Sequence, residues 1–162
     1  MENNVILRRL RYTFDFSDDT MIKLFDLGGL EVDRAQISDW LKGDDHPEHT
    51  KLNDNKLATF LNGLIVMKRG KKDGPPMLPE KQLNNNLIFR KLKIALNLKD
   101  TDVIAIYDLV DMHISKHELS AIFRKPGQKQ YRECKDQFLR NFLYGLQFKE
   151  RPESKSEERE DE

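Results

Sequence analysis

The residues that could offer nitrogen or sulfur ligands to a metal ion such as zinc are four histidines and one cysteine. His113 and His117 are four positions apart, the spacing that places two imidazoles on one face of a helix. Ser115 is a typical helix-capping residue, so His113 is expected before that helix and away from its face. Only Cys134 could add a thiolate, and the other two histidines are His46 and His49. We therefore predict no metal site and no cofactor.

A covalent catalyst would need a nucleophile with a base and a group that orients the base. Cys134 has no such partners that the sequence identifies. The chain also lacks a glycine-rich loop that could hold a phosphate, a serine in a sharp strand-to-helix turn, and an evident pair of catalytic acids. We predict a protein that is not an enzyme, with no catalytic residues and no identified small-molecule substrate.

A cluster of basic side chains could instead contact the phosphates of a nucleic acid, because lysine and arginine neutralise the phosphate backbone. The chain as a whole is neutral, with 28 basic and 28 acidic residues, so any such surface has to be local. Residues 1–70 carry 10 basic and 12 acidic groups, whereas residues 85–152 carry 13 and 8. The candidate nucleic-acid contacts are Lys116, Arg124, Lys125, Lys129 and Arg132.

The elements that position these residues come from a duplication. The segment Asn3–Leu10 aligns without a gap on Asn85–Leu92, 82 positions later, and Phe60–Leu64 aligns on Phe142–Leu146 at the same offset. One offset that fits both ends indicates a tandem repeat. We expect a first repeat at residues 1–70 and a second at 85–152. Cys134 then corresponds to Leu52, which suggests a half-buried packing position.

Hydrophobic residues recur at helical spacing in both copies, and no segment shows the alternation of a strand. We predict four helices in each repeat. The first covers about 4–14 and 86–96, and Asp18 and Asp100 are expected to cap the second. The third begins at the capping boxes Asp33–Gln36 and Ser115–Glu118. The fourth contains Gly63 and Gly145, whose recurrence indicates that another helix crosses closely there. Trp40 and Phe123 are predicted core anchors.

Two segments lie outside the repeats. Residues 71–84 are rich in glycine and proline and predict a linker. Residues 153–162 hold six acidic and two basic residues without an apolar one, which predicts a disordered acidic tail. No apolar run approaches the roughly 18 residues that cross a membrane. With one cysteine and no secretory pattern at the N-terminus, we expect a cytoplasmic protein without membrane contact.

The segment Val32–Gly43 resembles the recognition-helix stretch of phage-repressor-type helix-turn-helix domains. In such domains apolar residues anchor the helix while its first exposed positions face DNA. The second copy, residues 114–125, keeps Ser115, Leu119 and Ile122. We therefore expect the third helix of each repeat to be helix-turn-helix-like, with the more basic surface on the second repeat.

The pattern of residues 3–12, the sequence Phe60–Ile65 followed by Lys68–Gly70, and the duplication together resemble the YehS-like family of bacterial proteins. This resemblance covers nearly the whole chain except the tail. It implies an all-helical tandem of a domain of unknown function, and it supplies no site residues.

The sequence thus predicts an all-α protein of two tandem four-helix repeats that pack together. Two functions remain open. The first is a non-catalytic binding or regulatory protein that presents helical surfaces to a protein partner or to a second copy of itself. The alternative is a nucleic-acid-binding protein that uses the basic third-helix region of the second repeat.

Overall fold

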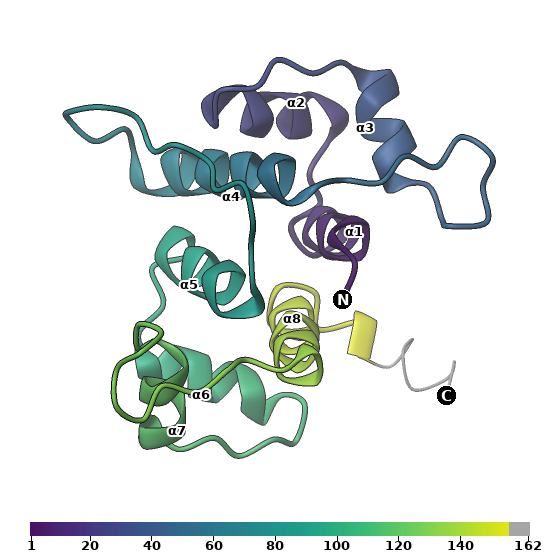
Figure 1. Cartoon of the computed structure of the whole chain (residues 1–162). Helices are drawn as coiled ribbons and strands as arrows, with labels where there is room; N and C mark the ends of the chain where they lie inside the picture. Colours follow the sequence, from purple (N-terminus) through teal and green to yellow (C-terminus); the bar gives the residue numbers. More distant parts are fainter. Residues whose placement is uncertain (156–162) are drawn as a thin grey trace. The chain divides into compact units, whose positions relative to one another are not determined.

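A computed structural model describes residues 1–155, and this part of the chain contains α-helices and no strand (Figure 1). The all-α prediction is confirmed. The helices, in chain order, are α1 Asn3–Phe14, α2 Asp18–Leu27, α3 Arg34–Leu41, α4 Asp54–Arg69, α5 Asn85–Ala95, α6 Asp100–Asp108, α7 Lys116–Ile122 and α8 Asp136–Glu150.

The predicted start of the third helix is confirmed in both repeats. In α3, the Asp33 carboxylate accepts from the Gln36 backbone N–H at 2.8 Å, and the Gln36 side chain accepts from the Asp33 N–H at 3.0 Å. In α7, the Ser115 hydroxyl accepts from the Glu118 N–H at 3.1 Å, but the Glu118 side chain makes no return bond to the Ser115 N–H, so the capping box predicted there is only half formed. These bonds satisfy amides that a helix start leaves without an intrahelical acceptor.

The caps predicted for the second helix are wrong by one residue. Ser17 caps α2 by accepting from the Thr20 N–H at 3.1 Å, and Asp18 is the first helical residue. Likewise α6 begins at Asp100, after Lys99, whose N–H donates to Asp102. The aspartates are still favourable at these positions, because a carboxylate in the first turn is attracted to the helix N-terminus.

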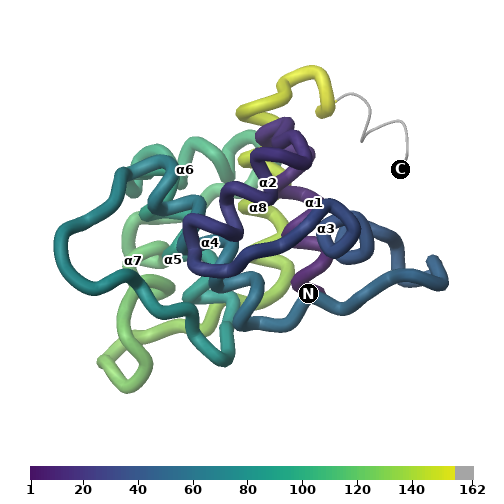
Figure 2. Tube along the Cα trace, turned by 90° about the horizontal axis from the view of Figure 1, so that it is seen from above, coloured from purple at the N-terminus to yellow at the C-terminus, as the bar shows by residue number. Residues whose placement is uncertain are grey.

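The chain forms two compact units, Met1–Asn97 and Leu98–Glu162. In the first unit α4 packs against α1, α2 and α5; Figure 2 follows the chain through these helices. Phe25 lies at the centre of its core, 5.2 Å from Trp40 and 5.3 Å from Phe60 between ring centroids. Although α5 begins the second sequence repeat, it packs on α4 of the first. The boundary between the two compact units therefore lies after α5, whereas the predicted linker, residues 71–84, lies before this helix.

The second unit contains α6, α7 and α8, and its core is centred on Tyr107, the counterpart of Phe25. The Tyr107 ring lies 4.8 Å from Phe138 and 6.1 Å from Phe142, and its hydroxyl donates to the Phe138 carbonyl at 2.8 Å. Burial raises the pKa of the Tyr107 hydroxyl. The predicted tail begins at residue 153. Ser154 is buried, and its hydroxyl donates to the Arg151 carbonyl. Residues 156–162 of the predicted tail lie outside the described part of the chain.

Close helix crossing explains the recurrent glycines, as predicted. A methyl group at Gly63 of α4 would overlap the backbone carbonyl of Leu24 in α2. A methyl group at Gly145 of α8 would overlap the carbonyl of Ile106 in α6. Leu24 and Ile106 are themselves 82 residues apart, so the two repeats build the same crossing.

The prediction of two matching aromatic anchors is only half right. Trp40 is buried, but Phe123 is partly exposed. The residue 82 positions after Trp40 is Ile122, which is buried and occupies the anchor position. The turn before the third helix spans six residues in the first repeat (28–33) and seven in the second (109–115). Both are longer than the three or four residues of a helix-turn-helix motif, so only the helix order resembles that motif.

Candidate functional site

Four of the five predicted nucleic-acid contacts lie in one ordered loop between α7 and α8, residues 123–135, which we call the basic loop. Three backbone bonds fix it: Gln128 N–H to the Lys125 carbonyl, Tyr131 N–H to the Gln128 carbonyl, and Arg132 N–H to the Ala121 carbonyl, each 3.1 Å. The loop extends outside the helices of its unit (Figure 2). Its side chains are therefore presented from a defined backbone.

The first repeat builds the same backbone with different charges. In its counterpart, residues 41–53, which we call the acidic loop, His46 N–H donates to Gly43, His49 N–H to His46 and Thr50 N–H to Asp39. Each of these bonds lies exactly one repeat before its partner in the basic loop. The basic loop has five basic residues and one acidic residue, whereas the acidic loop has two and three. The two loops thus have the same backbone fold although their net charges differ in sign.

The predicted basic residues differ in their surroundings. Lys125, Lys129 and Arg132 are exposed, whereas Arg124 is partly buried and donates from Nη1 to the Lys129 carbonyl at 2.7 Å. Lys116 is exposed at the first position of α7, roughly 10 Å from the loop along the helix axis, given 1.5 Å per residue. The structure gathers four of the five residues and sets Lys116 apart.

The acidic loop neutralises much of its own charge. Lys42 Nζ lies 2.6 Å from the Asp39 carboxylate and 2.9 Å from that of Glu48. The hydrogen bond to Asp39, followed by that to Glu48, raises the pKa of Lys42, and Lys42 in turn lowers the pKa of Glu48. His49 Nε2 lies 3.4 Å from Asp44. Lys42 and Glu48 thus have ionic partners within the loop or in α3, and His49 lies beside Asp44.

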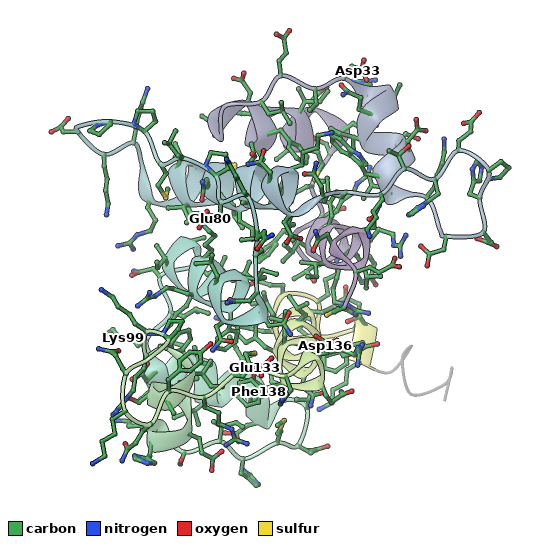
Figure 3. The ribbon with its side chains drawn as sticks, viewed as in Figure 1. Asp33, Glu80, Lys99, Glu133, Asp136 and Phe138 are labelled. Atoms are coloured by element: carbon green, nitrogen blue, oxygen red, sulfur yellow. The ribbon has the colours of Figure 1, made fainter. Side chains whose placement is uncertain are left out.

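Cys134 is a packing residue, as its correspondence with Leu52 predicted, but it is fully buried rather than half-buried. Burial, with smaller contributions from Asp136 and Glu133, raises the pKa of its thiol to about 12. Figure 3 labels Glu133, which precedes α8, and Asp136, the first residue of α8. Because the thiolate is the nucleophilic form, this environment opposes covalent chemistry at Cys134.

We expect Cys134 to resist a thiol reagent in the folded protein. Its reaction with a disulfide reagent at pH 8 should be slower by about a hundredfold or more than in urea, since both burial and the raised pKa reduce the accessible thiolate. Stability should also fall as pH rises from about 9 to about 12, because the unfolded chain loses this proton first. Equal reaction rates in buffer and in urea would contradict this account.

The histidines are not brought together. His113 is exposed before α7, and its Nδ1 lies 3.1 Å from Asp108. His117 belongs to the first turn of α7, after the Ser115 cap, as predicted. Within residues 1–155, no group of three or more His, Cys, Asp and Glu side chains has the arrangement of a metal site.

Sequence reasoning did not single out two exposed apolar residues at one repeat position. Tyr12 on α1 is 41% exposed, and Ile94 on α5, exactly 82 residues later, is 45% exposed. The other large exposed hydrophobic residues among those described are Met77 and Leu78, which lie in the linker. Both positions lie outside the apolar face of their helix, yet each carries an apolar residue. The helical periodicity of the sequence could therefore have identified them.

A buried ionic cluster was also missed. Lys91 of α5 is only 6% exposed, and its Nζ donates to Asn62 Oδ1 of α4 at 2.6 Å and pairs with Glu80 at 3.0 Å. Figure 3 shows Glu80 where the linker returns over α4. The adjacent Asn55 amide donates to the carbonyls of Pro79 and Glu80. These contacts attach the end of the linker to the unit.

The family described as "Protein of unknown function (DUF1456)" matches the chain twice, over residues 3–70 and 85–151. The chain is 42% identical over 147 residues to the "Uncharacterized protein YehS" of Escherichia coli (strain K12), which covers 90% of this chain and 94% of that protein. No solved structure matches the chain. None of the described helices is both long and apolar enough to span a membrane.

Proposed function

Because the chain belongs to the DUF1456 family, whose description assigns no activity, we propose a function from the chain's own geometry: it is a non-catalytic cytoplasmic protein that presents helical surfaces to a protein partner. The observation that carries this proposal is the exposed apolar residue at one position of both repeats, Tyr12 and Ile94. Helix formation does not require a large apolar side chain at an exposed position. Its presence at the same position of both repeats therefore favours a role in binding.

Each of these residues belongs to a short outward row on its helix. Val5, Arg8 and Tyr12 are at spacings that face one side of α1, and Leu87, Arg90 and Ile94 repeat the row on α5. The apolar members at the start of the rows, Val5 and Leu87, are partly exposed. Arg8 donates to the Lys42 carbonyl at 2.7 Å, which holds its side chain along the surface.

This row fits a partner that offers an apolar surface with an acidic group near it. Apolar side chains supply the buried area of a protein interface, and arginine is enriched there because its planar head pairs with carboxylates. The absence of an activated nucleophile at Cys134 supports a binding role over catalysis. The alternative is that the same rows bind a second copy of this chain. The experiment below distinguishes that copy from a different protein.

The test compares two single substitutions of exposed apolar residues. Ile94→Glu alters the repeat position, whereas Leu78→Glu alters a residue that is 83% exposed in the linker and has no counterpart on α1. Both should cost little stability, about 0.5 kcal/mol or less, because neither side chain is in the core. Each variant is used as bait for the soluble proteins of its own cell, with and without nuclease, and bound proteins are identified by mass spectrometry.

We expect the wild-type chain and Leu78→Glu to retain the same nuclease-resistant protein, and Ile94→Glu to lose it at least tenfold. Sedimentation of the purified chain at several concentrations then shows whether that protein is a second copy. The proposal is wrong if the wild-type chain retains nothing specific, or if Ile94→Glu retains the partner as well as Leu78→Glu does.

A further inference from the structure

We propose that the basic loop, residues 123–135, is a binding site for the phosphate backbone of a nucleic acid, separate from the apolar rows on α1 and α5. The loop belongs entirely to the second compact unit, and the rows to the first. The two repeats share one loop backbone but differ in the charge that it carries.

A structural role for these cations is the first alternative, and the acidic loop argues against it. The same three backbone hydrogen bonds close both loops, although the first has two basic and three acidic residues and the second has five and one. At the positions of Lys125, Lys129 and Arg132 the acidic loop has Gly43, Pro47 and Thr50, so closing the loop does not require a cation at these three positions. Arg124 differs, because its guanidinium donates to the Lys129 carbonyl and its counterpart, Lys42, is also basic.

A solvated surface of mixed charge is the second alternative, and the distribution of acids opposes it. The single acid of the basic loop, Glu133, has its carboxylate 3.4 Å from Lys135 at the end of the loop. Charges in the acidic loop are instead paired through Lys42. Lys125 and Lys129 are exposed on this fixed backbone, and neither forms an ion pair with another described residue. Such cations attract a polyanion, because each phosphate contact releases condensed counterions.

The other residues of the loop favour a nucleic acid over a membrane. Among the described residues, none of the large hydrophobic residues of high exposure lies in it, and its two aromatic residues, Phe123 and Tyr131, are only partly exposed, so the loop offers little apolar surface to lipid. It contains Gln128 and Gln130, both exposed, and amide side chains are common hydrogen-bond donors to phosphate and sugar oxygens. Gly127 and Gln130 adopt positive φ angles of 88° and 68°, which turn the exposed part of the loop tightly.

The experiment measures binding of the full chain to a fluorescently labelled mixed-sequence DNA duplex and to a labelled single strand of RNA, by anisotropy. Titrations run from about 50 to 200 mM salt, the range over which phosphate contacts weaken strongly. Polyglutamate and vesicles that contain phosphatidylserine are used as unlabelled competitors. These two competitors represent an acidic protein and an anionic membrane.

The test variant is Lys125→Gln, Lys129→Gln, which changes only residues of the basic loop and spares Arg124 and its loop contact. The matched control is Lys23→Gln, Lys81→Gln, which removes the same charge from exposed lysines outside the loop. We expect the test variant to bind at least about tenfold more weakly at low salt and to reduce the salt slope by about one for each lysine that contacts phosphate. The control should bind with a dissociation constant within about twofold of that of the wild type, because it loses no phosphate contact.

Three results would overturn the proposal: no binding of the wild-type chain to either nucleic acid at low salt, equal weakening by the test and control variants, or displacement by polyglutamate or vesicles as effective as displacement by unlabelled duplex. Unchanged circular dichroism spectra and thermal midpoints of both variants show that the loop change did not unfold the chain. The bait experiment with Ile94→Glu is independent, because that residue is outside the loop.

Discussion

Replacing Gly63 with alanine should lower the free energy of unfolding by about 2 kcal/mol, even though alanine is the better helix former by about 1 kcal/mol. The added methyl would overlap the carbonyl carbon and oxygen of Leu24, which belong to the backbone of α2 and cannot rotate away. The two helices must therefore separate, and the contacts of the surrounding core are lost. Urea denaturation followed by circular dichroism measures the change.

The control for this prediction is Ser38→Ala, on the exposed side of α3, which should change stability by less than about 0.5 kcal/mol. Gly145→Ala should repeat the loss in the second repeat, because Ile106 occupies the position of Leu24. A Gly63→Ala protein at least as stable as the wild type would show that the helices tolerate a wider crossing.

Replacing Lys91 with alanine is expected to cost about 2–3 kcal/mol. Removing one partner of a buried ion pair costs about 3–5 kcal/mol, and the lower figure applies because Glu80 is 30% exposed and can recover some hydration. The Asn62 side chain, which is buried, also loses the donor that reaches its oxygen. Thermal and urea denaturation of the two proteins give the difference.

Lys81→Ala is the matched control, since Lys81 is exposed one residue after Glu80 and should change stability by less than about 0.5 kcal/mol. Lys91→Met tests the physical reason. Methionine retains most of the apolar length but not the charge, so this variant isolates the ionic contribution. If Lys91→Ala and Lys81→Ala unfold at the same denaturant concentration, the buried cluster contributes nothing to stability.

The secondary structure was predictable because each helix carries its signal locally. The apolar stripe of α4 and the capping box at Asp33 depend on residues within a few positions of one another. The misplaced caps show the limit of that signal, because Ser17 and Asp18 are both acceptable capping residues and only the backbone decides which one is outside the helix.

The candidate sites were predictable to different degrees. The five basic residues could be listed from composition, and four of them lie in one loop, but only the hydrogen bonds show that the loop has an acidic counterpart of the same fold. The exposure of Tyr12 and Ile94 depends on which face of each helix is covered. That face is set by other helices, far away in the sequence.

By itself, the sequence determined the duplication, the helical class and the close crossing at Gly63 and Gly145, because periodicity and repeated small residues are properties of the chain's order. Only the tertiary structure decided that α5 packs on α4 of the preceding repeat, and that Lys91 is buried beside Asn62 and Glu80. The physical reason is that an amphipathic helix specifies the side that must be covered, whereas the element that covers it depends on long-range packing across the linker.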